Sequence, residues 1–172
     1  MRTLVKLDCE VVCVPCVTSH AAYAAMLTAA NPAQVIDFPQ EIAQDVKNRG
    51  CVNIGILATS GTVKTGFLQR VMENSGLCAV IPDPQIQSCV DSVIYDDIKA
   101  GKTADPQKVQ EIICAMKAQG CDSLVLGCTE LPLMRLELDA DGKYAGMYIS
   151  DSLKVLAKAA LRECGLPIKA GK

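Results

Sequence analysis

Two cysteines stand where an apolar stretch gives way to a polar turn and a helix. Cys16 lies in VPCVTSH (residues 14–20), and Cys128 lies in LVLGCTELP (residues 124–132). Open parallel sheets bind ligands at the carboxyl ends of their strands, which is where both cysteines are expected. The start of a helix also offers unpaired N–H groups and partial positive charge, which lower the pKa of a thiol and favour the reactive thiolate. The two cysteines are therefore the first candidates for a reactive site.

The chain holds 10 cysteines among 172 residues. A disulfide scaffold does not fit, because such scaffolds are shorter and rich in loops. We expect mostly reduced thiols and a cytoplasmic protein. Apart from Cys16 and Cys128, the cysteines are interpreted as small buried hydrophobic residues: Cys9, Cys13, Cys51, Cys78, Cys89, Cys114, Cys121 and Cys164.

The CVPC of residues 13–16 supports a different reading as a thiol oxidoreductase. It is a C-x-x-C motif between an expected strand and an expected helix, as in thioredoxin-like proteins. Against this reading, Cys13 lies inside the apolar run, where burial is expected, and Cys128 is left without a role.

Two further sites are weaker. Cys9, Cys13, Cys16 and His20 could be counted as zinc ligands, but in an extended strand the first two point away from the third. The AGKTAD of residues 100–105 contains Gly-Lys-Thr but lacks the earlier glycine of a phosphate-binding loop.

The elements that must position these residues alternate between strand and helix, which predicts an α/β fold with a parallel sheet covered on both faces. The segment around residues 31–40 is the expected boundary between two lobes. Asp151 and Ser152 are expected to cap the last helix. Strands are expected over residues 9–16, 52–59, 78–82, 121–128 and 147–150, and helices over 19–30, 61–76, 85–101, 106–120 and 151–164.

Composition narrows the function classes. Hydrophobic residues make up 50% of the chain and aromatic residues 3%, so the core must be aliphatic. The net charge is -2 and no basic stripe is present, which argues against nucleic acid as a partner. No apolar run is long enough for a signal peptide or a membrane span, so no membrane partner is expected.

The motifs VPCVTSH and LGCTELPL, with GILATSGTVKTGFLQ (residues 55–69) between them, resemble the aspartate/glutamate racemase family. The aspartate racemase branch is the more similar, because Glu130 stands where glutamate racemases usually carry histidine. The resemblance implies two similar α/β lobes, each giving one cysteine to a cleft between them. It also implies an isomerase of amino-acid metabolism that uses neither a pyridoxal cofactor nor a metal.

The resemblance assigns the two thiols to a two-base reaction on a small acidic amino acid, with aspartate first. Inverting an α-carbon needs one base to remove the proton from one face and an acid to return it on the other. Cys16 and Cys128 would exchange these roles with the direction of the reaction.

The resemblance also implies a set of substrate contacts. Thr18 and Thr129 would hold the α-carboxylate, and Lys99 would contact the second carboxylate. Each polar position has a plainer reading: a threonine after a strand can simply cap a helix, and a lysine near a helix end can simply be solvated. The full predicted set is Val17, which replaces the family's asparagine, with Thr18, Thr59, Thr62, Lys99, Thr129 and Glu130.

Family members have further strands and helices before the first cysteine. We therefore expect a partial first lobe over residues 1–40, a second lobe over 41–150, and a C-terminal helix over 151–172 that packs back between the lobes. Weak activity is expected, and an open strand edge invites pairing into a homodimer. The alternative is a catalytically silent relative that binds only a small carboxylate or a partner chain.

Overall fold

Five strands form the central sheet of the computed structural model, which describes residues 1–134, 136 and 141–168. Their order across the sheet is β4-β3-β5-β7-β6. β3, β4, β5 and β7 run parallel, and the short β6 pairs antiparallel with β7. The strands are β3 (Asn53–Leu57), β4 (Cys78–Val80), β5 (Ser123–Leu126), β6 (Lys143–Tyr144) and β7 (Met147–Asp151).

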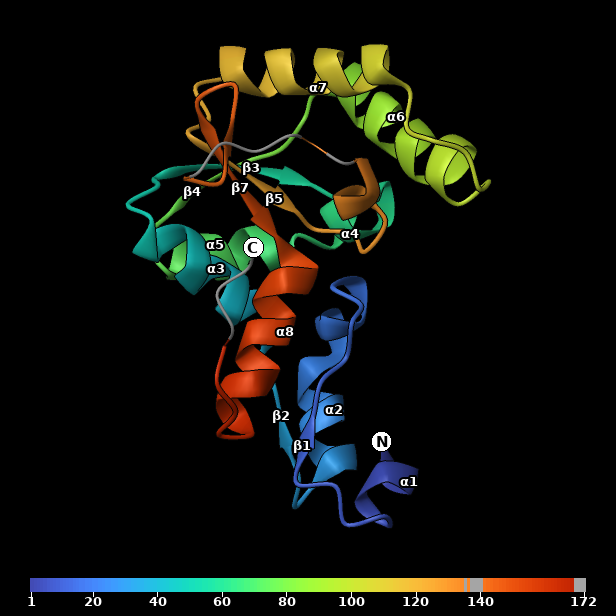
Figure 1. Ribbon diagram of the computed structural model, residues 1–172, viewed down its shortest axis with the longest axis vertical. Helices are drawn as coiled ribbons and strands as arrows, with labels where there is room; N and C mark the ends of the chain where they lie inside the picture. The colour runs from blue at the N-terminus through green and yellow to red at the C-terminus, as the bar shows by residue number, and fades with distance from the viewer. Residues whose placement is uncertain (135, 137–140, 169–172) are drawn as a thin grey trace.

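Helices cover both faces of this sheet (Figure 1). On one face, α3 (Phe38–Asn48), α5 (Phe67–Asn74) and α8 (Ser152–Glu163) enclose a core that includes Ile54 and Ile56 of β3. On the other face, α6 (Pro84–Ser92) and α7 (Pro106–Ala118) enclose a second core with Leu57. The inner strands β3, β5 and β7 are mainly apolar because both of their faces are buried. The predicted α/β class with a covered parallel sheet is confirmed.

Aspartate side chains begin four of these helices. Asp37, Asp83, Asp105 and Asp151 each accept a hydrogen bond from a backbone N–H of the following turn. These bonds satisfy N–H groups that the helix itself leaves unpaired. The predicted cap at Asp151 is confirmed, with the N–H of Lys154 donating at 3.1 Å. The predicted cap at Ser152 is wrong, because its hydroxyl donates instead to the carbonyl of Leu126 at 2.6 Å.

Two predicted helices are interrupted. The helix expected over residues 61–76 is divided into α4 (Ser60–Thr65) and α5, because Gly66 adopts a left-handed conformation with φ of 64°. The helix expected over 85–101 begins as α6 and continues as the π-helix η2 (Val93–Ile98). Lys99 stands at the end of η2.

The first 37 residues form a smaller part beside α8 (Figure 1). A two-stranded parallel sheet joins β1 and β2 there. The strand predicted over residues 9–16 is wrong, because β1 spans only Val11–Val12. Pro15, which has no N–H to donate to a sheet, lies beyond it. The elements are α1 (Arg2–Val5), β1, the 3-10 helix η1 (Thr18–Ala22), α2 (Tyr23–Ala30) and β2 (Gln34–Val35).

The predicted burial of the other cysteines is largely wrong. Cys121 is buried, whereas Cys9, Cys51 and Cys89 are half-buried, and Cys13, Cys78, Cys114 and Cys164 are exposed. The exposed group lies at positions that the core does not reach. Cys78 lies on the edge strand β4, and Cys164 caps the end of α8.

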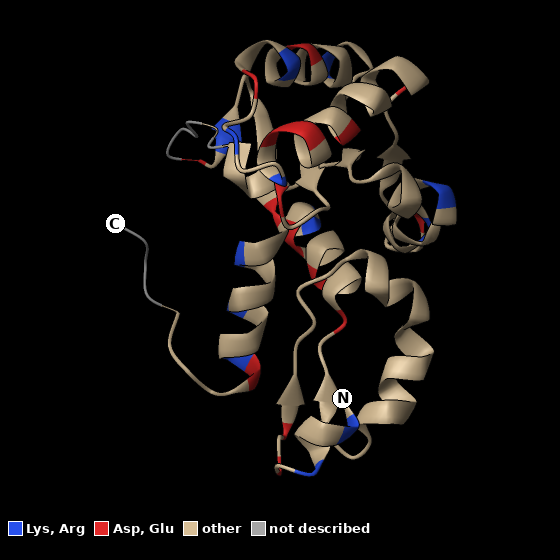
Figure 2. Ribbon diagram, turned by 90° about the vertical axis from the view of Figure 1, so that its right-hand side faces the viewer, with Lys and Arg blue, Asp and Glu red and all other residues tan. Residues whose placement is uncertain are grey.

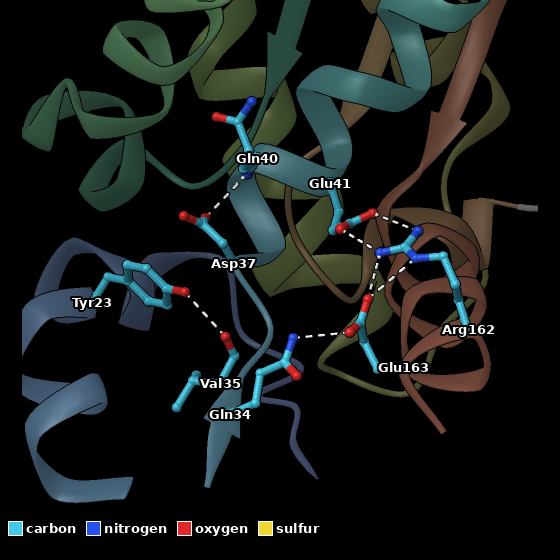
Figure 3. Close-up of polar contacts among 8 residues, drawn as sticks. All are labelled: Tyr23, Gln34, Val35, Asp37, Gln40, Glu41, Arg162 and Glu163. Atoms are coloured by element: carbon cyan, nitrogen blue, oxygen red, sulfur yellow. Dashed lines mark hydrogen bonds and ion pairs between the residues drawn. The ribbon is translucent and has the colours of Figure 1, made fainter. Parts of the chain in front are cut away.

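A polar network joins the first part to the rest of the chain (Figure 3). The side-chain amide of Gln34 donates to Glu163 at 2.9 Å. Arg162 donates two hydrogen bonds to the carboxylate of Glu41, at 2.6 and 3.1 Å. Tyr23 anchors α2 by donating to the carbonyl of Val35 at 3.0 Å. β2 is therefore fastened to α8, and α8 is in turn fastened to α3.

Charged residues are unevenly distributed between the two parts (Figure 2). No Lys, Arg, Asp or Glu stands between Glu10 and Asp37, so α2 is uncharged along its whole length. Among the described residues, no helix combines the length and the apolar character needed to cross a membrane.

Candidate active site

Cys128 lies at the carboxyl edge of the sheet, two residues after the end of β5. The preceding Gly127 donates its N–H to the carbonyl of Leu57, at the end of β3, at 2.7 Å. A Cβ on Gly127 would lie 3.2 Å from that carbonyl oxygen, so the absence of a side chain allows this close approach. The end of β5 is thereby held against the end of β3.

Glu130 brings Cys128, Thr129 and Lys99 together. Its Oε2 accepts hydrogen bonds from the Cys128 thiol at 2.8 Å and from the Thr129 hydroxyl at 3.0 Å. Its Oε1 lies 3.4 Å from the Nζ of Lys99. The Lys99 ammonium also lies over the ring of Tyr95, 4.8 Å from its centroid. A thiol, a carboxylate and an ammonium thus form one continuous chain.

The electrostatics of Cys128 differ from the expectation. Burial raises the pKa of this thiol to about 12, and the hydrogen bond to the Glu130 carboxylate acts in the same direction. The predicted lowering of its pKa by a helix start is therefore wrong. The helix that follows, η3 (Leu131–Met134), is a single 3-10 turn, which offers little dipole.

The pKa values of Glu130 and Lys99 shift as those of an ion pair should, downward for the carboxyl group and upward for the ammonium. Burial alone would raise the pKa of Glu130, but the bonds from Cys128 and Thr129 and the charge of Lys99 hold it below its usual value. Burial alone would lower the pKa of Lys99, but the Glu130 carboxylate raises it. Glu130 and Lys99 are therefore both charged in this site.

Cys16 is an exposed thiol in a turn that its neighbours fix. Its N–H donates to the carbonyl of Val14 at 2.8 Å, and its own carbonyl lies 2.9 Å from Nδ1 of His20. A carbonyl can only accept, so Nδ1 carries the hydrogen. The His20 ring is buried between the rings of Tyr23 and Phe38, with centroids 6.0 and 5.6 Å away. His20 thus positions the backbone of Cys16.

The Val17 side chain is 2% exposed and packs into the same core as Phe38. The predicted contact of Val17 with substrate is corrected accordingly: its side chain faces the core, and only its backbone is left to meet a ligand.

A chain of threonine hydroxyls joins the Cys16 turn to the edge of the sheet. Thr18 Oγ1 lies 2.5 Å from Thr62 Oγ1, which in turn lies 3.0 Å from Thr59 Oγ1. Thr59 caps α4, and Thr62 is 1% exposed. Thr59 and Thr62 therefore take part in capping α4, the structural role that their positions allowed. Through Thr18 they also hold the turn that carries Cys16.

The turn after β3 is braced from α6 by two residues that sequence reasoning missed. Asp91 accepts hydrogen bonds from the N–H and the hydroxyl of Ser60, and Gln87 donates to the carbonyl of Ala58 at 2.9 Å. No motif marks Asp91 or Gln87, because both lie on an amphipathic helix with no local signal.

The predicted residues thus form two groups at one edge of the sheet. Thr59 and Thr62 follow β3, whereas Cys128, Thr129 and Glu130 follow β5. These two strands are parallel neighbours. Their carboxyl ends meet at the same edge, where open α/β sheets bind ligands. Within the described residues, no three His, Cys, Asp or Glu side chains gather closely enough to hold a metal ion.

Known proteins share this fold. A Pyrococcus horikoshii OT3 aspartate racemase homologue superposes with a TM-score of 0.82 and 19% identity, over 95% of this chain and 70% of that one. The Picrophilus torridus aspartate racemase gives a TM-score of 0.75 and 23% identity, over 98% and 68%. The glutamate racemase of Shewanella loihica is 25% identical over 159 residues, which cover 91% of this chain and 58% of that protein.

This chain therefore spans less than two thirds of the length of that glutamate racemase. The family match extends through both parts of the fold: residues 1–160 fit the sequence profile described as Asp/Glu/Hydantoin racemase. That range includes the turns of both Cys16 and Cys128, and on this basis the chain belongs to the Asp/Glu/hydantoin racemase family.

Proposed function

We propose that this chain racemises an acidic amino acid, with aspartate as the first candidate, by proton transfer at the α-carbon between Cys16 and Cys128. One thiolate removes the α-proton and the other thiol returns a proton to the opposite face. The reaction takes no cofactor. It suits the cytoplasm, where thiols stay reduced.

The observation that carries this proposal is the contact chain from Cys128 through Glu130 to Lys99. It combines a thiol that can exchange a proton with a cation that can receive the second carboxylate of an acidic amino acid. Thr129 and Thr18 offer hydroxyl groups for the α-carboxylate. Hydrogen bonds to that carboxylate stabilise the negative charge that develops when the α-proton leaves.

The test is loss of the α-proton signal of L-aspartate and L-glutamate in heavy water, followed by NMR, together with polarimetry. We expect exchange and loss of optical rotation with the unaltered chain. Cys16→Ser and Cys128→Ser should each lower the rate by roughly 10²–10⁴-fold, the usual contribution of an acid–base group. Cys114→Ser, at an exposed thiol on α7, is the matched control and should retain the rate. Unchanged exchange in either site variant would rule out the two-thiol reaction.

The exposure of Cys13 supports a second candidate, the thiol oxidoreductase. Cys13 and Cys16 are both exposed and three positions apart, as that chemistry requires. The distinguishing assay is reduction of a disulfide substrate in the presence of a dithiol. Turnover that Cys13→Ser abolishes would support the oxidoreductase, whereas the racemase should tolerate Cys13→Ser.

A further inference from the structure

One carboxylate serves two purposes in this site. Oε2 of Glu130 accepts the hydrogen bond of the Cys128 thiol, and Oε1 pairs with the ammonium of Lys99. The Glu130 carboxylate, which could accept the thiol proton, is therefore also the group that forms an ion pair with Lys99, the cation proposed to bind substrate. Glu130 therefore contacts both the group proposed to recognise the substrate and the thiol proposed to transfer its proton.

The two partners are unequally free to move. The Lys99 side chain is 44% exposed, whereas that of Glu130 is 21% exposed and is held by two further hydrogen bonds. Lys99 also has a long flexible stem. An incoming anion would therefore draw Lys99 outward and leave Glu130 in place beside Cys128.

Losing the ammonium would make Glu130 a stronger base. With Lys99 in place, both oxygens of the carboxylate are bonded and a nearby positive charge stabilises the ionised form. Without it, the nearest proton available to the carboxylate is that of the Cys128 thiol, already pointing at Oε2.

We propose that the second carboxylate of the substrate displaces Glu130 from Lys99, and that the released Glu130 then takes the proton of the Cys128 thiol. The S–H bond breaks, an O–H bond forms on Glu130, and the negative charge passes from the carboxylate to the sulfur. Glu130 acts on the reaction through Cys128 and Lys99, as a positioning residue. This inference rests on the proposed function and adds a reason for acidic substrates: a monocarboxylic amino acid leaves the Lys99–Glu130 pair closed and the thiol protonated.

The exchange can be tested by binding alone, with calorimetric titration of succinate as a dicarboxylate probe and propionate as a monocarboxylate control. Glu130→Gln removes the competitor for Lys99, so succinate should bind roughly two- to fivefold more tightly, the range expected for a partly exposed ion pair. Lys99→Gln should weaken succinate binding. Propionate binding should be the same in all variants, and Glu73→Gln, at an exposed glutamate on α5, should match the unaltered chain.

Kinetics with aspartate give an independent readout. In Glu130→Gln, KM should fall because Lys99 is free, while kcat should fall because Cys128 has lost its proton acceptor. A merely structural role for Glu130 would raise KM and lower kcat together, and circular dichroism would show the altered fold.

The outcomes separate this inference from the proposed function. No succinate binding by the unaltered chain, or weaker binding by Glu130→Gln, overturns the exchange whatever the racemisation assay gives. If succinate binding tightens in Glu130→Gln but no variant exchanges the α-proton, the displacement of Glu130 stands and the racemase function fails. A fall in KM with unchanged kcat would overturn the proton transfer to Glu130.

Discussion

Replacing Gly127 with alanine should disturb the strand end that carries Cys128. A Cβ at this position would lie 3.2 Å from the Leu57 carbonyl oxygen, 3.3 Å from the Ala58 Cβ and 3.4 Å from a Leu68 methyl group. Ordinary contacts between carbon atoms are about 3.5–4.0 Å. Several neighbours must therefore give way by a few tenths of an ångström, and one of them is backbone that already accepts the Gly127 N–H.

The cost follows from this crowding. Adding one methyl group to a well-packed interior destabilises by about 1–3 kcal/mol. For a chain of this size, each kcal/mol lowers the melting temperature by roughly 2–4 °C. Displacement of Cys128 by a few tenths of an ångström should also slow the proposed reaction, by less than the roughly hundredfold that a full ångström can cost.

The assay is urea unfolding followed by far-UV circular dichroism. Gly61→Ala is the matched control, because its Cβ would meet only the Thr59 hydroxyl at 3.8 Å and it lies within α4. Alanine there should stabilise by about 0.5–1 kcal/mol through helix propensity. The two variants should move the unfolding midpoint in opposite directions. A Gly127→Ala midpoint equal to or above that of the unaltered chain would refute the close approach as the cause.

Three further predictions concern the rest of the chain. Burial beside a carboxylate raises the pKa of Tyr148 to about 12, so the stability that this raised pKa contributes is complete below pH 10 and is lost as the pH rises to about 12. Tyr148→Phe should therefore remove part of the loss of stability at alkaline pH, whereas Tyr95→Phe, at an exposed tyrosine, should leave that loss unchanged. Arg162→Met removes the ion pair with Glu41 and should lower the free energy of unfolding by about 0.2–1 kcal/mol at low salt and by less at high salt, because the Arg162 side chain is 54% exposed. An equal effect of Lys158→Met, on the same helix, would contradict this prediction. We also propose a homodimer formed through the uncharged α2, on which Leu27 is exposed. Light scattering should find the unaltered chain dimeric and Leu27→Lys monomeric, and equal masses of the two would exclude α2 as the dimer interface.

The central sheet could be predicted from the sequence because its inner strands, β3, β5 and β7, are buried on both faces. Long apolar runs such as residues 52–59 and 121–128 leave few alternatives, and the helices between them carry Asp-Pro starts and regular apolar spacing. The same runs end in the polar turns that hold Thr59 and Cys128. The location of the candidate site followed from strand direction alone.

The differences at the cysteines have one physical cause, which is that the burial of a side chain depends on its neighbours in space. Residues 9–16 are as apolar as the central strands, but within the part of the chain that the structure describes they pair only with the two-residue β2, so Cys13 and Cys16 remain exposed. The raised pKa of Cys128 could not be predicted from the sequence for the same reason. It depends on burial and on Glu130, two positions away, and an expected helix start gave no sign of either.

The two thiols stand in different surroundings, and this difference has a defined consequence for a racemase. Cys16 is exposed, whereas Cys128 is half-buried with its pKa raised to about 12. The enantiomers of an amino acid have equal free energies in water, so kcat/KM must be the same in both directions. The difference between the two thiols can therefore appear only as a change of kcat and KM by the same factor between the two directions. In the proposed reaction, Cys128 as the acid is already in the protonated state that it needs, whereas Cys128 as the base must first lose its proton, which we propose passes to Glu130. The direction that begins with Cys16 as the base should therefore have the higher kcat, with a correspondingly higher KM.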